Sequence, residues 1–312
     1  MIVCINDVCI NVVRQEWAMR ILALDIGGTS IKSAVCSDEI LTEHKEQDTD
    51  ACLGGEFVMQ RAAEILKSYG PCDAIGISTA GQVDVQEGKI RYANDNIPGY
   101  TGMEIRKRLE AEFRVPVAVE NDVNAAAVGE GHYGAARGFE DYLCLTYGTG
   151  VGGAIVIGKQ IFRGAAGSAG EVGSVVVHGR QVVKGRRISG CYEDYASTSA
   201  LIRTVHAYDP DIHNGRELFE RISDDPVLQT LLDDWIWEIA HGLVTLIHIF
   251  NPQCILLGGG VMAQDYVVEK VKEVTLERIM PSFRDVVFKR AGLGNRAGLW
   301  GAVHLAKERV GR

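Results

Sequence analysis

Two glycine-rich segments, each lying between two runs of apolar, β-prone residues, most constrain what this chain can fold into. The first is Asp25-Ile26-Gly27-Gly28-Thr29, and the second is Gly148-Thr149-Gly150-Val151-Gly152-Gly153. A turn made largely of glycine lets backbone N–H groups approach an anion closely. We therefore expect two similar β-hairpins, one in each half of a duplicated fold, that hold a polyphosphate from both sides.

Composition excludes several classes of protein. The chain has 312 residues, of which 46% are hydrophobic and 23% charged, so it is long enough for two domains with full cores. Its net charge of −9 argues against a nucleic-acid partner, and no apolar run reaches the roughly 20 residues of a membrane helix. The eight cysteines are scattered without a CxxC pair, which favours reduced thiols in a cytoplasmic protein.

The order of apolar runs and helix-period segments predicts an α/β fold with mixed sheets flanked by helices. A strand–turn–strand pattern starts at Ile21 and restarts at Tyr142, which indicates two related lobes with a cleft between them. A long helix is expected over 231–250. The expected division is an N-terminal extension over 1–20, an N-terminal lobe over 21–125, a C-terminal lobe over 126–292 and a terminal helix over 293–312 that returns to the first lobe.

The glycine segments carry side chains suited to phosphate chemistry. Asp25 could hold Mg²⁺, directly or through water, while Thr29 offers a hydroxyl and Lys32 a cation. A third cluster, Gly258-Gly259-Gly260, joins an expected strand to an expected helix, where a nucleotide can approach a helix N-terminus. An ordinary hairpin turn and a tight strand–helix connection remain the alternatives.

Acidic residues lie where a hydroxyl substrate would need them. Asp122 follows an expected strand and begins an alanine-rich helix, so it could accept a proton from a substrate hydroxyl, although Asn121 or Asp122 could instead only cap that helix. Glu171 and Glu193 flank a variable stretch and could face sugar hydroxyls. Taken singly, each glutamate is more typical of a solvated surface.

Together these motifs resemble the ROK family of sugar kinases, within the actin-like ATPase superfamily, from about Ile21 to the C-terminus. The residues that carry the resemblance are Asp25–Thr29, Ser78–Gly81, Asn96–Tyr100, Glu120–Asp122, Gly148–Gly153, Gly170–Gly173 and Gly258–Gly260.

The resemblance implies an ATP- and Mg²⁺-dependent kinase that phosphorylates the 6-hydroxyl of a hexose or N-acetylhexosamine, with Asp122 as the general base, and that forms a homodimer. The implied sugar-binding residues are Gly81, Asn96, Asn121, Asp122, Glu171, Ser174 and Glu193. The implied nucleotide-binding residues are Asp25, Gly27, Gly28, Thr29, Lys32, Gly148, Thr149, Gly150, Gly152, Gly153, Gly258, Gly259 and Gly260.

The chain departs from the family at its zinc motif. Ser174 stands at the position of a histidine, and the three cysteine positions hold Lys184, Arg186 and Cys191. One thiolate cannot build a closed four-ligand site, so we expect no structural zinc. His178 is expected to be a packed or surface residue. The four positive charges of Arg180–Arg187 suggest a solvated loop, or one ordered by acidic neighbours.

Ser174 also bears on specificity, because a small side chain leaves room for a bulkier group at C1 or C2 of the sugar. Glucose is the default substrate, N-acetylmannosamine the best challenger, and a β-glucoside a further alternative. A non-catalytic sugar sensor related to the ROK repressors is the second hypothesis. About twenty residues precede the first strong strand, too few for a DNA-binding domain, and the retained Asp25, Asp122 and glycine turns favour an enzyme.

Overall fold

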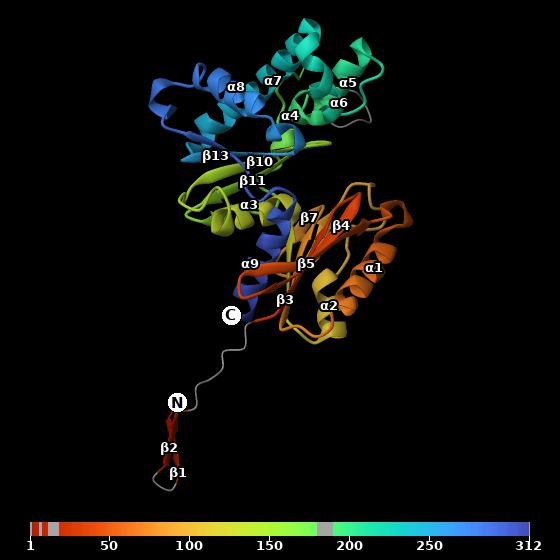
Figure 1. Ribbon diagram of the computed structural model, residues 1–312, viewed down its shortest axis with the longest axis vertical. Helices are drawn as coiled ribbons and strands as arrows, with labels where there is room; N and C mark the ends of the chain where they lie inside the picture. The colour runs from red at the N-terminus through yellow and green to blue at the C-terminus, as the bar shows by residue number, and fades with distance from the viewer. Residues whose placement is uncertain (1, 6–7, 12–18, 180–189, 312) are drawn as a thin grey trace.

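The computed structural model describes residues 2–5, 8–11, 19–179 and 190–311. Its architecture is mixed α/β, with two five-stranded sheets flanked by helices (Figure 1). The first sheet has the order β5-β4-β3-β6-β9, and the second has the order β12-β11-β10-β13-β14. Two small hairpins accompany them, β1–β2 (Ile2–Ile5, Val8–Asn11) and β7–β8 (Gln82–Asp84, Lys89–Tyr92).

Both large sheets are built in the same way, which confirms the predicted duplication. In the first, β3 (Ile21–Ile26) pairs antiparallel with β4 (Ser30–Ser37) and parallel with β6 (Ala74–Thr79). In the second, β10 (Tyr142–Tyr147) pairs antiparallel with β11 (Val151–Ile157) and parallel with β13 (Cys254–Gly258). The two glycine-rich segments therefore occupy equivalent hairpin turns. The outer strands are β5 (Ile40–Asp48), β9 (Val117–Asn121), β12 (Gln160–Ile161) and β14 (Val287–Arg290).

Helices cover both faces of the first sheet. Helices α1 (Gly55–Ser68) and α2 (Ile105–Phe113) share one core with it, through buried residues such as Leu66 and Leu109. The terminal helix α9 (Ala297–Val310) packs on the opposite face, where Leu299 and Val303 meet Ile21 and Ala23. The chain end thus returns to the first sheet, while the boundaries of the two lobes stay a prediction.

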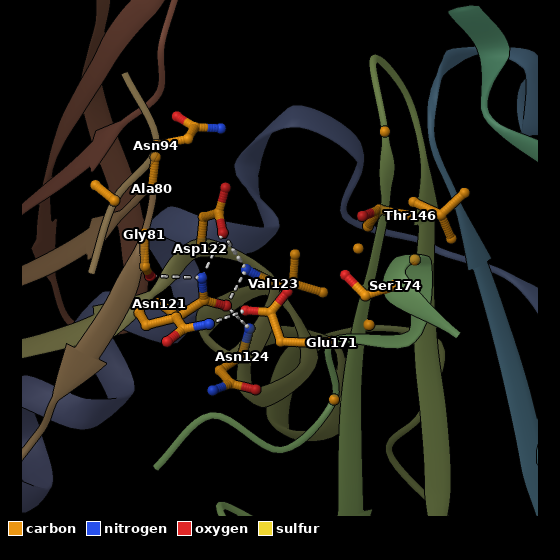
Figure 2. Close-up of a pocket in the computed structure, with 18 of the residues that line it drawn as sticks. Ala80, Gly81, Asn94, Asn121, Asp122, Val123, Asn124, Thr146, Glu171 and Ser174 are labelled. Carbon is orange, nitrogen blue, oxygen red and sulfur yellow. Dashed lines mark hydrogen bonds between the residues drawn. The ribbon is translucent and has the colours of Figure 1, made fainter. Parts of the chain in front are cut away.

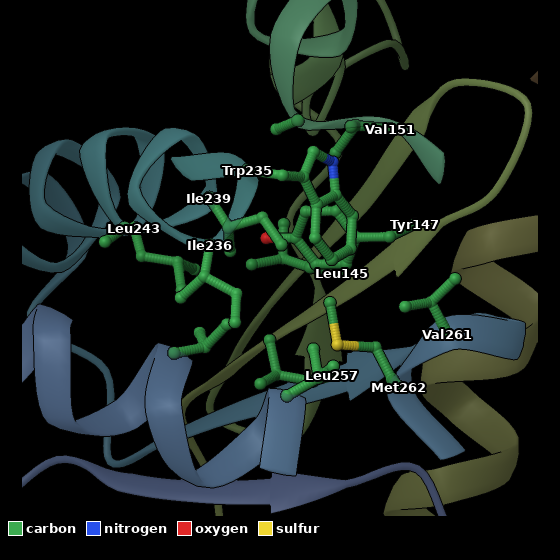
Figure 3. Close-up of a cluster of buried hydrophobic side chains, with 14 of the residues drawn as sticks. Leu145, Tyr147, Val151, Trp235, Ile236, Ile239, Leu243, Leu257, Val261 and Met262 are labelled. Atoms are coloured by element: carbon green, nitrogen blue, oxygen red, sulfur yellow. The ribbon is translucent and has the colours of Figure 1, made fainter. Parts of the chain in front are cut away.

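The second sheet carries the larger core. Figure 3 shows Trp235 and Ile239 of α7 (Pro226–Phe250) lying against Leu145, Tyr147 and Leu257 of the sheet. Helix α8 (Asp265–Leu276) adds buried valines to the same cluster. On the other face of this sheet lies α3 (Asp122–Tyr133).

Helices α3 and α9 cross between the two sheets with their backbones in contact. A Cβ added to Gly301 would lie 1.7 Å from the carbonyl oxygen of Ala125, and one added to Gly129 would lie 2.3 Å from that of Ala297. Helix α9 touches the first sheet equally closely, because a Cβ on Gly76 would lie 2.1 Å from the oxygen of Ala302. Only glycine allows these approaches.

Two sequence expectations are wrong in detail. Helix α7 begins at Pro226, not near 231, because the Asp225 side chain accepts hydrogen bonds from the amides of Val227 and Leu228 and Pro226 occupies the first turn. The glycine cluster ending β13 leads into a 3₁₀ turn over Gly260–Ala263 before α8 begins at Asp265. The sequence analysis had also not anticipated α4 (Tyr192–Ala196), α5 (Thr198–Tyr208) and α6 (Gly215–Arg221).

Among the described residues, no helix combines the length and the apolar character needed to cross a membrane.

We expect Gly301→Ala to lower the free energy of unfolding by about 1–3 kcal/mol, because the added methyl group must push α9 away from α3. Gly138→Ala is the matched control, since a Cβ at Gly138 meets no atom within 4 Å. Urea denaturation monitored by circular dichroism measures both. Equal stability of the two variants would contradict the close crossing.

Candidate functional site

A cavity of about 490 Å³ lies between the ends of the first-sheet strands and the second glycine hairpin. All seven residues implied as sugar-binding line it, from Gly81 and Asn96 on one side to Glu171, Ser174 and Glu193 on the other. Residues of the nucleotide set line it too, namely Gly28, Gly148, Thr149, Gly150, Gly152, Gly153 and Gly259. The fold thus brings together residues from distant parts of the chain.

Asn121 and Asp122 lie where β9 ends and α3 begins. The sequence left open which of them caps the helix, and the structure shows that Asn121 does. The Asn121 side-chain oxygen caps α3 by accepting hydrogen bonds from the amides of Val123 and Asn124. Its amide nitrogen donates to the Gly81 oxygen at 3.0 Å and to Asp122 Oδ1 at 2.8 Å. Asn121 therefore caps the helix and also orients the Asp122 carboxylate in the cavity (Figure 2).

The environment of Asp122 makes it a weak acid suited to proton transfer at neutral pH. Burial, aided by the nearby charge of Asp25, raises the pKa of Asp122 to about 6. Hydrogen bonds from the Val123 amide and from Asn121 oppose this shift. A carboxylate with such a pKa is ionised at pH 7 and more basic than an exposed aspartate.

The charge of Asp25 acts on Asp122 although the two residues are far apart in sequence. Its Oδ1 accepts a hydrogen bond of 2.6 Å from Ser78 Oγ, and Lys32 is its cross-strand neighbour. Burial raises the pKa of Asp25 above its ordinary value. A buried carboxylate that feels a second negative charge is a setting that suits Mg²⁺, since a divalent cation relieves the repulsion.

A second, larger cavity of about 1260 Å³ adjoins the first. Tyr147, Gly148 and Thr149 line both cavities, so the second hairpin turn lies at their junction. The remaining walls come from α5, α6 and the Gly260 turn. A Cβ at Gly28, Gly148 or Gly260 would meet no atom within 4 Å, so backbone at all three turns faces open space.

The remaining members of the implied nucleotide set lie outside the cavities, and Gly259 has a packing role as well. Asp25, Gly27, Thr29, Lys32 and Gly258 line neither of these two cavities. Gly259 adopts φ +109°, and a Cβ there would lie 2.1 Å from the Tyr147 oxygen. This glycine is thus required where the chain leaving β13 passes over the end of β10.

Gln82 and Ser168 are cavity residues that sequence reasoning missed. Gln82 Nε2 donates to Glu171 Oε1 at 2.9 Å, and Gln82 Oε1 accepts from Ser168 Oγ at 3.0 Å. Because Gln82 lies on β7 and the other two residues follow β12, these bonds bridge the two halves of the chain. Glu193 lies between the second hairpin and the 3₁₀ turn Val172–Ser174, since Cβ atoms on Gly150 and Gly173 would come within 2.7 and 3.0 Å of its Oε2.

Glu120 forms a second bridge between the halves. Its side chain is only 2% exposed, and its Oε2 lies 2.6 Å from Arg163 Nη2. Its other oxygen accepts hydrogen bonds from the Asn121 amide and from Asn124 Nδ2. The ion pair therefore supports the backbone that carries Asp122. The one sequence signal for it is the acidic Glu120 directly before Asn121 and Asp122.

Of the four positions of the family's zinc motif, only Cys191 holds a zinc-binding side chain. Ser174 lines the sugar cavity, and Cys191 is buried at the N-terminus of α4. Lys184 and Arg186 belong to the Arg180–Arg187 loop, which lies outside the described residues. The expected lack of structural zinc stays a prediction. His178, expected to be a lone histidine, lies beside Glu238 and His241.

The family model for the ROK family matches residues 21–309. This chain belongs to the ROK family. It is 32% identical to a β-glucoside kinase from Klebsiella pneumoniae, with 92% of this chain and 97% of the relative covered. A ROK hexokinase from Thermus thermophilus superposes with a TM-score of 0.80 at 34% identity, covering 94% of this chain and 99% of that one.

A ROK glucokinase from Streptomyces griseus, solved in complex with glucose and AMPPNP, superposes with a TM-score of 0.81 at 29% identity and covers 93% of this chain and 99% of that one. The actin-like ATPase fold implied by the sequence is thereby confirmed. The homodimer and the cytoplasmic location stay predictions.

We expect Arg163→Met to lower the free energy of unfolding by about 2–3 kcal/mol, because it leaves the buried Glu120 carboxylate unpaired. Glu120→Gln keeps an acceptor for Asn121 and Asn124, so the double variant should lose less than the sum of the single variants. A double-mutant cycle in urea measures this coupling. Additivity within about 0.5 kcal/mol would contradict it.

Proposed function

We propose that this protein is an ATP-dependent kinase that transfers the γ-phosphoryl group to the 6-hydroxyl of a hexose. The observation that carries the proposal is the position of Asp122. It lies in the cavity lined by all seven implied sugar-binding residues, has a pKa of about 6, and is joined through one glycine turn to a second cavity large enough for a nucleoside.

In this proposal the sugar occupies the smaller cavity. Asn96, Asn121, Glu171 and Glu193 exchange hydrogen bonds with its hydroxyl groups and orient the 6-hydroxyl toward Asp122. As that oxygen bonds to the γ-phosphorus, Asp122 accepts its proton, and the bond from phosphorus to the β–γ bridging oxygen breaks to release ADP. The turns at Gly28 and Gly148 offer backbone N–H groups to the phosphates.

The larger cavity would take the nucleoside of ATP, an assignment supported by the AMPPNP found in the Streptomyces griseus relative. Asp25 would hold Mg²⁺, directly or through water, and the bound ion would neutralise charge on the phosphates. Lys32 lies opposite Asp25 on the neighbouring strand, and its positive charge favours the ionised form of that carboxylate.

The choice of sugar follows from Ser174. This small side chain lines the cavity at the position of the family's histidine, and it leaves space for a substituent at C1 or C2 of the sugar. Glucose is the default substrate, N-acetylmannosamine the main challenger and a β-glucoside the third. The similarity to the Klebsiella pneumoniae β-glucoside kinase supports the β-glucoside as a candidate substrate.

Replacing the proposed base separates chemistry from binding. We expect Asp122→Asn to lower kcat by about 10²–10⁴-fold with little change in KM for the sugar. Because the carboxylate must be ionised to accept a proton, wild-type kcat/KM should fall about tenfold per pH unit below a pKa of about 6. A coupled assay of ADP release between pH 5 and 8 measures both.

Asp95→Asn is the matched control, since Asp95 is exposed and lines neither cavity. The raised pKa of Asp122 means that its ionised form is disfavoured in the folded protein, so Asp122→Asn should not lower Tm at pH 8. Wild-type turnover by Asp122→Asn would show that the base is misassigned. Absence of turnover by the wild type on every hexose, N-acetylhexosamine and β-glucoside would favour a sugar sensor.

A histidine at position 174 tests the origin of specificity. We expect Ser174→His to lower kcat/KM for N-acetylmannosamine by about tenfold or more relative to glucose, because the larger ring fills the space for the substituent. Steady-state kinetics on both sugars, with a β-glucoside as the third substrate, measure the ratio. An unchanged ratio would show that Ser174 does not set the preference.

A further inference from the structure

Two imidazoles and one carboxylate converge on the surface of the second sheet's helical layer, outside both cavities. Glu238 and His241 are one turn apart on α7, and His178 approaches them from the segment that follows Ser174. Glu238 Oε2 lies 2.7 Å from His178 Nε2 and 3.4 Å from His241 Nδ1. One nitrogen or oxygen from each side chain lies within 4.8 Å of the others.

We propose that His178, Glu238 and His241 form a binding site for a divalent transition metal ion, for which Zn²⁺ is the best match. Two imidazole nitrogens and a carboxylate oxygen are a ligand set that zinc uses, with water in the fourth position. Tetrahedral zinc with bonds of about 2.0–2.2 Å needs ligand atoms roughly 3.3 Å apart. The distances from Glu238 Oε2 to the two histidine nitrogens, 2.7 and 3.4 Å, lie on either side of this value.

The ligands are held in place before any ion arrives. Helix α7 fixes Glu238 and His241 on adjacent turns of one face. The His178 amide donates to the Gly190 oxygen at 3.1 Å, and its ring lies edge-on to Tyr195 with centroids 4.5 Å apart. Little conformational freedom therefore remains to be lost when a metal binds.

Charge and access also suit a cation. Within the described residues, the ion pairs of Glu238 are both with histidines, the side chains that would bind the metal with it. The three side chains are 38%, 26% and 44% exposed, for His178, Glu238 and His241 respectively, which leaves an approach from solvent. In the sequence His178 stands as a lone histidine, and nothing there indicates that Glu238 and His241 of α7 lie beside it.

A metal at this position would connect the substrate cavity to α7. His178 follows Glu171 and Ser174 along one segment, and the Gly190 contact joins that segment to α4, which carries Glu193. Tyr192 already ties α4 to α7 by donating to the Ile239 oxygen at 2.7 Å. The metal would add a second tie between these elements.

The test uses the full chain stripped of metal with EDTA and then titrated with Zn²⁺ alone. We expect isothermal titration calorimetry to show one site per chain. His178→Gln, Glu238→Gln and His241→Gln should each lower the Zn²⁺ affinity by more than about 100-fold. That is more than the loss seen when a residue that only hydrogen-bonds a metal ligand is replaced. The exposed control His44→Gln should leave the affinity unchanged. Zn²⁺ should also slow amide exchange over 190–196 and 238–242.

Co²⁺ distinguishes this site from binding to cysteines, because ligation by nitrogen and oxygen gives visible bands without a thiolate charge-transfer band. The expected spectrum lacks that band and is lost in Glu238→Gln. The proposal is overturned if the wild type binds no Zn²⁺, if all three variants bind as the wild type does, or if the Co²⁺ spectrum shows thiolate ligation. None of these readouts depends on kinase activity.

Discussion

The crossing of α3 and α9 fixes how the two sheets lie relative to each other and where Asp122 meets the cavity. Glycine at positions 129 and 301 brings the two helices into backbone contact, and Gly76 brings α9 equally close to the first sheet. Asp122 begins α3, while Gly298 near the start of α9 lies where a Cβ would come within 2.9 Å of the Asp25 carboxyl group. The same packing that joins the two sheets therefore places Asp122 at the cavity and Asp25 close enough for its charge to act on Asp122.

Burial gives Asp122 its chemical character, and the charge of Asp25 adds to the effect. An exposed aspartate at a helix N-terminus would have a low pKa and would be a poor proton acceptor. Here burial and a neighbouring negative charge act together to raise the pKa of Asp122. Asn121 limits this effect by donating a hydrogen bond to the same carboxylate, so the helix cap and the proton acceptor work as one unit.

Local sequence signals predicted the repeated part of the fold well. The hairpin turns, the mixed order of strands and helices and the terminal helix follow from apolar periods and glycine positions, which depend on near neighbours in the chain. The Asp25–Asp122 pair, the Glu120–Arg163 ion pair and the bridge through Gln82 join residues that are far apart in the chain. Such contacts leave no periodic trace in one sequence, because they depend on how the two sheets meet.

The α4–α6 region was missed for a related reason. Helices α4 and α6 span only Tyr192–Ala196 and Gly215–Arg221, so neither length nor hydrophobic period distinguishes them from loops. Helix α5 is longer, and its buried Leu201 and Val205 do follow a helical spacing. Their order comes from tertiary contacts, as where Trp235 of α7 donates to the Ser197 oxygen and Tyr192 donates to α7. The walls of the larger cavity could thus be recognised only in three dimensions.

The bonds that cross the smaller cavity differ in kind from the α3–α9 crossing. Gln82, Glu171 and Ser168 can exchange their mutual hydrogen bonds for water with little net change in free energy, whereas the helix crossing cannot open without losing close packing. Opening the cavity side would therefore cost less than separating the two helices, but it would also have to break the buried Glu120–Arg163 ion pair. A ligand that contacts Asp122 and Glu171 together acts as a cross-link between the two halves, so its affinity and the closing of the protein are one equilibrium.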